Sequence, residues 1–277
     1  MPFTIFDPNM NKIDYPVGVT PLDFLVSAIE KERYIETVNG IPGNVNYGFD
    51  YKEREVTLNF WLRHYHGEHD HKLLKSELYA MLDSQPYFYV SDDRLPSRVL
   101  KLAVDEPYLP DRINGSNIST LEVKCQIIGL PFWRTKYTTQ DIEKEGYEAL
   151  AEEFGMADGI NQDMANYRFQ TSVFSVWNGG NVTIDPRQMH LDIRIWHSTS
   201  KGNATIKNLT TGDKVIIYRE HTDSFINLIG SKVMLADTNW LRESNRQYIT
   251  LAPGENKIRI SNTNFSDVTF DFPFYFK

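Results

Sequence analysis

The chain has 277 residues, with 37 acidic and 29 basic side chains and a formal charge of −8. A chain of this length buries roughly three quarters of its surface on folding, so its core needs no disulfide or metal to hold it. The net acidity argues against a protein that coats nucleic acid, because such proteins usually carry a basic face. Aromatic residues make up 13% of the chain, which favours β-sheets.

The single cysteine and the lack of long apolar runs indicate the cellular compartment of the protein. Cys125 is the only cysteine, so an intramolecular disulfide and a cysteine-rich zinc site are both excluded. The N-terminal residues lack a basic stretch followed by an apolar run, so we expect no signal peptide. No 18 apolar residues follow one another, and we therefore expect no membrane insertion. These features predict a soluble protein that is made in a reducing cytoplasm.

The first half of the chain shows strand and helix patterns. Apolar residues alternate with polar ones over residues 56–62 and 120–127, which predicts two half-buried strands and places Cys125 in a core site. Residues 70–83 carry one apolar stripe at helical spacing, and Pro86 follows it. We expect this helix to pack on a sheet. The stripe consists of Leu74, Leu78, Met81 and Leu82.

The composition changes after residue 133, and we place the domain boundary in the stretch 155–166. Thr138 and Asp141 form a capping-box signal, so residues 139–154 are predicted to be a second helix that Gly155 ends. Residues 155–166 are polar and read as a linker. We predict an N-terminal domain at 1–135, a helix and linker at 136–166, and a C-terminal domain at 167–277 that folds by itself.

The C-terminal third reads as an all-β domain. Short strands with turn residues between them predict an antiparallel β-sandwich. Residues 205–220 are predicted to form a hairpin that turns at 211–213. Residues 268–276 alternate as one terminal strand, and Pro273 predicts that this strand lies at a sheet edge or pairs on one side only.

No catalytic pattern is present. Phosphate-binding loops, a nucleophile elbow and a His-Glu-x-x-His zinc pattern are all missing. Residues 64–71 hold four histidines and two carboxylates, a donor set that Zn²⁺ could use, but their placement at a strand end, a loop and a helix start favours a solvated polar loop. We therefore assign no catalytic residue, no metal site and no cofactor.

Three tryptophans in the second half are candidate contact residues for sugar or protein. Trp177, Trp196 and Trp240 could each stack on a sugar ring or anchor a protein contact. Trp196 is out of phase with Leu191, Ile193 and Ile195, so it should lie on the opposite face of its sheet. A second sheet could equally cover it. A carbohydrate-binding module is therefore the alternative function, and a glycoside hydrolase finds no paired acids to support it.

An ordered set of short strings resembles a known family. They stand at residues 2–7, 40–43, 47–49, 56–62, 73–82, 86–88 and 131–133, and in the second half at 176–181, 184–186, 206–213 and 251–256. Together they resemble the distal tail protein (Dit-like) of siphophages that infect Gram-positive bacteria. The segment at 138–166 is longer than the family pattern leads us to expect.

The resemblance implies a mainly β fold with an N-terminal split β-barrel that carries a helix, and a C-terminal galectin-like or carbohydrate-binding-like sandwich. It implies a structural virion protein at the tail tip, made in the host cytoplasm and without catalytic residues. The N-terminal domain is expected to form a homohexameric ring that continues the tail tube and lets DNA pass. Further expected partners are the tail tube protein, a tail-tip or fibre protein, and receptor-binding proteins. Residues proposed for an arm across the neighbouring subunit are Gly40, Pro42, Gly43, Tyr47 and Gly48.

Overall fold

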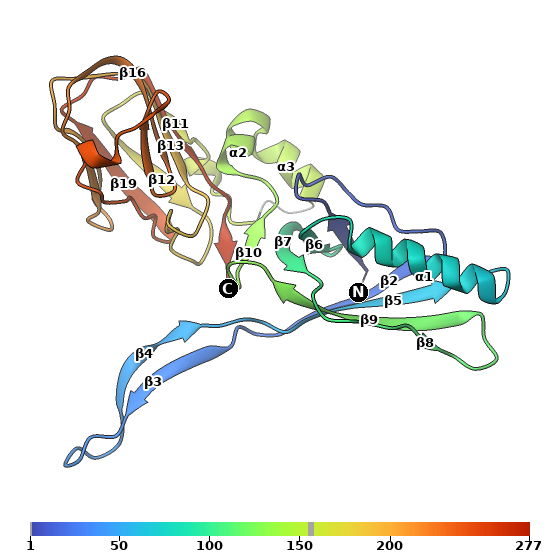
Figure 1. Cartoon of the computed structure of the whole chain (residues 1–277). Coiled ribbons are helices and arrows are strands. Elements are labelled where there is room, and N and C mark those ends of the chain that lie inside the picture. Colours follow the sequence, from blue (N-terminus) through green and yellow to red (C-terminus); the bar gives the residue numbers. More distant parts are fainter. Residues whose placement is uncertain (1, 155–157) are drawn as a thin grey trace. The chain divides into compact units, whose positions relative to one another are not determined.

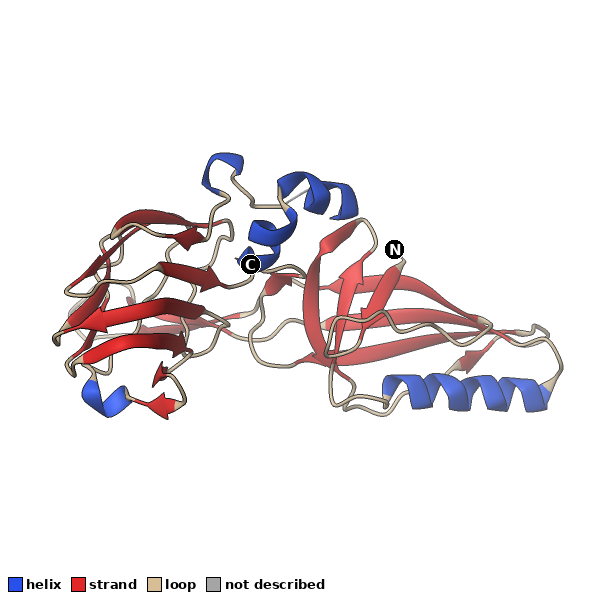
Figure 2. Ribbon diagram, turned by 90° about the horizontal axis from the view of Figure 1, so that it is seen from above, coloured by secondary structure: helices blue, strands red, loops and turns tan. Residues whose placement is uncertain are grey.

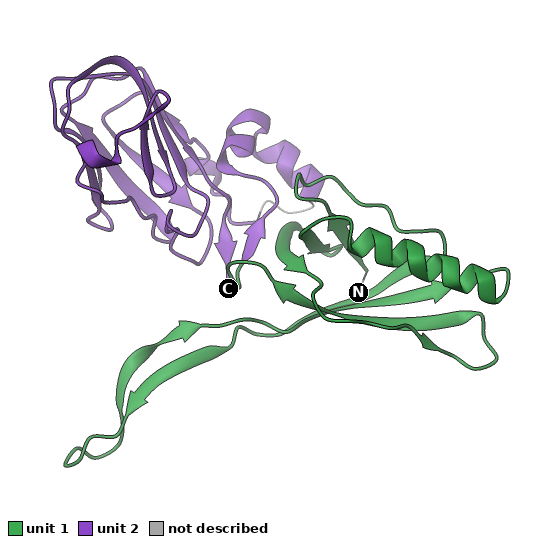
Figure 3. Ribbon diagram, viewed as in Figure 1, with its two compact units in different colours: residues 1–132 green, residues 133–277 purple. Residues whose placement is uncertain are grey.

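The computed structural model describes residues 2–154 and 158–277, and its secondary structure consists mostly of antiparallel strands. This confirms the mainly β fold class. The chain divides into two compact units, residues 1–132 (unit 1) and residues 133–277 (unit 2), which Figure 3 shows in different colours. Among the described residues, no helix combines the length and the apolar character that a membrane crossing requires.

Unit 1 is built on one sheet whose strands follow the order β1-β6-β7-β9-β5-β2, with β8 paired to β9. The order describes an open path rather than a closed barrel. A separate two-stranded sheet, β3-β4, extends from the β2–β5 hairpin (Figure 1). The elements of unit 1 are β1 (Phe3–Phe6), β2 (Val19–Val26), β3 (Lys31–Glu36), β4 (Val45–Tyr51), β5 (Val56–Arg63), α1 (Glu68–Leu82), β6 (Phe88–Asp92), β7 (Leu95–Ala103), β8 (Asp111–Arg112) and β9 (Ile118–Ile127).

The core of unit 1 lies on one face of β5 and β9. The two strands pair from Val56 opposite Cys125 to Arg63 opposite Ile118, and every second side chain is buried, as the alternation predicted. The thiol of Cys125 is buried in this core, and burial raises its pKa to about 12. A thiol with so high a pKa is protonated at neutral pH and has a packing role.

Helix α1 covers part of this core with the predicted apolar stripe. Its side chains Leu74, Leu78 and Leu82 are buried, and Figure 2 shows the helix lying along the strands. Asp70 fixes the turn that precedes the helix, because one of its carboxylate oxygens accepts the backbone N–H groups of Tyr65 and His66.

Unit 2 contains the predicted antiparallel sandwich. One sheet has the order β11-β20-β13-β16-β17-β18 and the other has the order β12-β19-β14-β15. The predicted hairpin is β14–β15. The elements of unit 2 are β10 (Trp133–Thr135), α2 (Thr139–Glu145), α3 (Tyr147–Phe154), η1 (Gln162–Met164), β11 (Arg168–Phe169), β12 (Val173–Asn178), β13 (Asp192–Ser200), β14 (Ala204–Asn208), β15 (Lys214–Ile217), β16 (His221–Ile229), β17 (Lys232–Leu235), β18 (Thr238–Asn239), η2 (Leu241–Glu243), β19 (Gly254–Ser261), β20 (Asp267–Asp271) and β21 (Tyr275–Phe276).

The segment before the sandwich differs from the single helix and linker that the sequence predicted. The capping box is present, since the backbone N–H of Thr138 donates to Asp141 Oδ2 at 2.7 Å. The helix, however, is divided into α2 and α3 at Gly146, which has a positive φ of 83° that L-residues rarely adopt. The predicted terminator Gly155 lies outside the described residues.

The predicted linker is also tied down at one described point. The backbones of Gly159 and Gly179 approach so closely that a Cβ on Gly179 would collide with the carbonyl oxygen of Gly159 and with the ring of Phe274. The indole N–H of Trp177 donates to the same Gly159 oxygen at 2.8 Å. This part of the segment is therefore packed on the sandwich.

The prediction for the terminal strand was wrong. Residues 268–276 do not form one edge strand: β20 ends at Asp271 and pairs on both sides, with β11 and with β13. Pro273 lies in the gap before β21. Its missing N–H therefore removes no bond from the ladder, which is why a proline is tolerated beside a strand in the interior of a sheet.

The residues around Pro273 are enclosed by the first residues of unit 2. Phe272 and Phe274 each exchange hydrogen bonds with Thr139 and Thr135, whose hydroxyls accept the two phenylalanine N–H groups at 3.1 and 2.9 Å. Tyr137 packs against Phe274, with ring centroids 6.3 Å apart. Both phenylalanine side chains are buried.

These contacts make a prediction about fragments. A fragment of residues 133–277 should unfold at a higher temperature than the fragment 167–277, because the shorter one leaves Phe272 and Phe274 uncovered. Burial of such a side chain contributes about 1.5–3 kcal/mol, so we expect a difference of roughly 10 °C or more by calorimetry. Equal midpoints would show that residues 133–166 do not stabilise the sandwich.

Candidate functional site

The most unusual feature of unit 1 is the hairpin of β3 and β4, which we call the arm (residues 31–51). The two strands pair with each other from Lys31 opposite Tyr51 to Glu36 opposite Val45, and they form a sheet of their own. An isolated two-stranded hairpin is only marginally stable in water. An arm of this kind therefore gains most from a surface that covers it.

The arm concentrates exposed apolar side chains. Of the eighteen large apolar side chains that are exposed in the described chain, six belong to these 21 residues. Tyr47 is the most exposed of the six, at 64% of its surface. Exposed apolar side chains gathered in one segment in this way suggest an interaction site. The six are Tyr34, Ile35, Val38, Ile41, Tyr47 and Phe49.

All five residues predicted for the arm lie in it. Gly40, Pro42 and Gly43 belong to the connection between β3 and β4, whereas Tyr47 and Gly48 lie on β4. Gly40 and Gly43 have positive φ values of 88° and 84°, which the turn of the connection requires. Strand β4 does alternate in the sequence, with Val45, Tyr47, Phe49 and Tyr51 at every second position. Strand β3 shows no such pattern and is exposed on both faces. The prediction of the arm used only the glycines, the proline and Tyr47 of this stretch.

The base of the arm is held by Arg54, which the sequence did not single out. Its Nε donates to the carbonyl oxygen of Pro131 at 2.8 Å and its Nη1 to that of Ser27 at 3.3 Å. Beside it, the ring of Tyr51 packs edge-on against Phe132 at 5.7 Å between centroids. These contacts tie the base of the arm to the end of unit 1.

Polar contacts along the arm keep its two strands in register. The hydroxyl of Tyr34 donates to Asp50 at 2.9 Å, and Lys52 pairs with Glu32 at 2.5 Å. The Lys31 ammonium lies 5.0 Å from the centre of the Phe49 ring. Each such exposed contact contributes little by itself, and their effect is to preserve an extended hairpin whose apolar side chains stay accessible.

The three candidate tryptophans lie in different surroundings. Trp196 is on the face opposite Ile193 and Ile195, as the alternation predicted, and it remains 40% exposed beside the ring of Phe225 at 4.4 Å. Trp177 is half-buried with its indole N–H bound to Gly159. Trp240 is half-buried under the guanidinium of Arg219. The structure therefore does not gather the three side chains into one site.

The histidine-rich segment is less solvated than expected. His64 and His71 are buried, with ring centroids 5.3 Å apart, and His71 Nε2 lies 3.0 Å from the hydroxyl of Ser119 on β9. His66 and His69 are exposed. The expectation of a polar loop is thus wrong for two of the four, because α1 folds back over the sheet and takes His71 with it.

Comparison with known proteins connects this architecture to phage tails. Residues 17–125, most of unit 1, match the family described as phage tail protein RIFT-related domain. The chain is similar in structure to the Dit protein (gp 19.1) of phage SPP1, described as a paradigm of the hub adsorption apparatus in phages that infect Gram-positive bacteria. The TM-score is 0.69 at 14% identity, over 98% of this chain and 99% of that one.

Two further similar chains come from the activated baseplate of phage p2. They have TM-scores of 0.47 and 0.48 at 12% identity, cover 98% and 99% of this chain and 97% of their own length, and are too distant to support an argument. A search of curated proteins finds no match. The resemblance to distal tail proteins is thus confirmed by the matched domain and by the shared fold.

The buried histidine pair leads to a prediction about pH. Burial, together with the charges of Arg112, His64 and Lys75, lowers the pKa of His71 from its ordinary value of 6.5. The unfolded chain therefore binds a proton at His71 near pH 6.5, whereas the folded chain binds it only at lower pH, so the stability of unit 1 should fall as the pH decreases below about 6.5.

Calorimetry at pH 7.5 and 5.5 measures this loss. Replacement of His71 by Gln, whose amide can hydrogen-bond to the hydroxyl of Ser119 as donor or acceptor, should reduce the fall in the thermal midpoint between the two pH values. Replacement of the exposed His69 by Gln serves as the matched control and should leave the fall unchanged. A His71→Gln variant with the full wild-type loss would contradict the prediction.

Proposed function

We propose that this protein is a structural virion component, the hub at the distal end of a siphophage tail, where it joins the tail tube to the baseplate and its receptor-binding proteins. The match of residues 17–125 to a phage tail domain family and the fold shared with the Dit protein of SPP1 support the proposal. The arm is the site on which the proposal rests. It extends away from the core of unit 1 (Figure 1) and its apolar side chains stay exposed, which suits a contact with another protein.

The proposed assembly is a homohexameric ring built by unit 1, in which the arm of each copy lies across the next. Such a head-to-tail contact joins two different surfaces of the chain and closes when six copies complete the rotation. If the six exposed apolar side chains of the arm were covered by a neighbour, their burial would contribute on the order of 6 kcal/mol per contact. The arm residues Gly40, Pro42, Gly43, Tyr47 and Gly48 then belong to the interface.

The net charge sets a condition on the ring. Six copies carry 6 × (−8) = −48 elementary charges, and like charge opposes closure. Such a ring has no net attraction for DNA, whose phosphates follow one another at about 1.7 Å along the axis, which suits a lumen that lets DNA slide. Because a Debye length near 10 Å at 0.1 M salt screens surface charges, closure should improve with ionic strength.

The second candidate, a carbohydrate-binding module, rests on Trp196 alone. Its ring is the one of the three predicted tryptophans that is exposed. A fluorescence titration with cell-wall sugars tests it, and a Trp196→Ser variant that binds as tightly as the wild type would exclude this residue as the contact.

The arm gives a prediction about assembly. The double variant Ile35→Ser/Tyr47→Ser should reduce the hexamer fraction at least tenfold at a given concentration, because it removes the most exposed apolar surface of the arm. Mass photometry between 0.05 and 0.5 M NaCl should show the species of six 32.2 kDa chains increasing with salt in the wild type. The control is Tyr218→Ser, which removes another exposed tyrosine, in unit 2.

Electron microscopy of tails labelled at Lys277 tests the location. The label should appear as a six-fold feature at the distal tip of the tail. A label elsewhere, or a tip without six-fold symmetry, would contradict the proposed function even if the free protein forms rings.

A further inference from the structure

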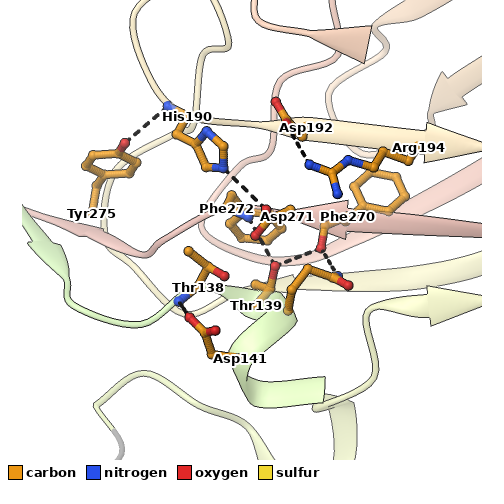
Figure 4. Close-up of polar contacts among 11 residues, drawn as sticks. Thr138, Thr139, Asp141, His190, Asp192, Arg194, Phe270, Asp271, Phe272 and Tyr275 are labelled. Atoms are coloured by element: carbon orange, nitrogen blue, oxygen red, sulfur yellow. Dashed lines mark hydrogen bonds and ion pairs between the residues drawn. The ribbon is translucent and has the colours of Figure 1, made fainter. Parts of the chain in front are cut away.

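Two aspartates face each other on the outer side of the six-stranded sheet of unit 2. Asp192, the first residue of β13, is the direct cross-strand partner of Asp271, the last residue of β20. Side chains of such partners point to the same face of a sheet, and two like charges directly opposite destabilise the pair. His190 stands two residues before β13 and turns its ring toward Asp271 (Figure 4).

The ligand atoms of these three residues converge. One ring nitrogen of His190 and one carboxylate oxygen each from Asp192 and Asp271 all lie within 4.8 Å of one another. Ion-to-ligand bonds of about 2.0–2.2 Å in a tetrahedral site place the ligands of one ion roughly 3.3–3.6 Å apart. Small side-chain rotations therefore suffice to bring the three atoms to bonding distance of a common centre.

The carboxylates are withdrawn from solvent and incompletely paired. The side chains of Asp192 and Asp271 are 9% and 17% exposed. Arg194 binds Asp192 Oδ2 at 3.1 Å and His190 Nε2 lies 3.5 Å from Asp271 Oδ2, whereas Asp271 Oδ1 is buried with no hydrogen-bond partner among the described residues. A buried carboxylate oxygen without a partner is costly, and a cation would satisfy it.

Asp271 keeps its charge in this setting. Burial by itself raises the pKa of a carboxyl group, but hydrogen bonds from His190 and Thr138 and the charges of His190 and Arg194 hold the pKa of Asp271 below its usual value. Two carboxylates and the one guanidinium of Arg194 give these three side chains a formal charge of −1, which suits a bound cation.

We propose that His190, Asp192 and Asp271 bind one divalent transition-metal ion of the class of Zn²⁺. One imidazole and two carboxylates suit Zn²⁺ or Mn²⁺, whereas Mg²⁺ and Ca²⁺ prefer oxygen donors alone. The ion would connect the start of β13 to the end of β20, beside Thr138 at the first turn of α2. Its effect is to convert a repulsive cross-strand pair into a bridge between two neighbouring strands of the sheet.

The test uses the metal-free full-length chain and Zn²⁺ alone as the probe. Calorimetric titration should give one tight site per chain, and the variants His190→Gln and Asp271→Asn should each bind at least tenfold more weakly, since even changes in the shell around metal ligands cost about 10–100-fold. Co²⁺ should give visible absorption bands in the wild type that both variants lose.

Two controls exclude the other exposed histidines. The double variant His66→Gln/His69→Gln removes the exposed histidines of the histidine-rich segment, and His197→Gln removes an exposed histidine that pairs with Asp223 at 2.6 Å in the same unit. Both should bind Zn²⁺ like the wild type. Loss of the tight site in either control, with retention in Asp271→Asn, would overturn the proposal.

Thermal unfolding separates metal binding from a folding defect. With EDTA present, the Asp271→Asn and His190→Gln variants should unfold within a few degrees of the wild type, because the aspartate change also relieves like-charge repulsion. Saturating Zn²⁺ should raise the midpoint of the wild type, as any ligand of the folded state does, and should leave both variants unchanged. An equal rise in the variants, or no saturable binding by the wild type, would overturn the assignment.

Discussion

The β2–β5 hairpin determines much of what this protein presents to its surroundings. Within the unit 1 sheet, β2 is the edge strand, and β5 pairs with both β2 and β9. Beyond Val26 and Val56 the same two chain segments continue as β3 and β4 without a further neighbour. The rigidity of the arm therefore depends on the buried ladder from which it grows, and Arg54 reinforces the point at which the support ends.

In unit 1, the residues that stabilise the fold are different from the residues that we propose for assembly. The side chains that alternate on β5 and β9 are buried and stabilise the unit, while those of the arm contribute almost nothing to the fold of their own chain. A surface that is free of any folding role can be shaped by contact with another subunit. The exposed apolar residues of the arm are the physical reason for assigning assembly to unit 1.

In unit 2, the first residues of the unit pack against the end of the chain. The phenylalanines on either side of Pro273 lie between strands, where no ladder satisfies their backbone, and the hydroxyls of Thr135 and Thr139 replace the missing partners. Because buried N–H groups are costly when unpaired, the segment from 133 to 139 is part of the sandwich in energetic terms. The acidic cross-strand pair of Asp192 and Asp271 lies next to this junction, and the ion proposed there would offset the repulsion between the two carboxylates.

The sequence by itself determined the elements whose residues follow a local pattern, such as apolar residues at strand or helix spacing. The alternation of β5 and β9, the stripe of α1, the capping box of α2 and the hairpin β14–β15 all follow from local spacing, because a residue's own neighbours decide which face it shows. The family resemblance placed the ring-arm candidates, and the structure locates all five in one exposed hairpin.

Only the tertiary structure decided the features that join distant residues. Strand β4 alternates in the sequence, but a local period does not show that its apolar side chains stay exposed, because the arm pairs only with itself. The break at Pro273 depends on hydroxyls more than 130 residues away, and the burial of His71 follows from the return of α1 over β9. The convergence of His190, Asp192 and Asp271 likewise arises from strand register, which places residues 79 positions apart directly opposite each other. Local patterns do not encode such pairings, because they are set by which strands become neighbours.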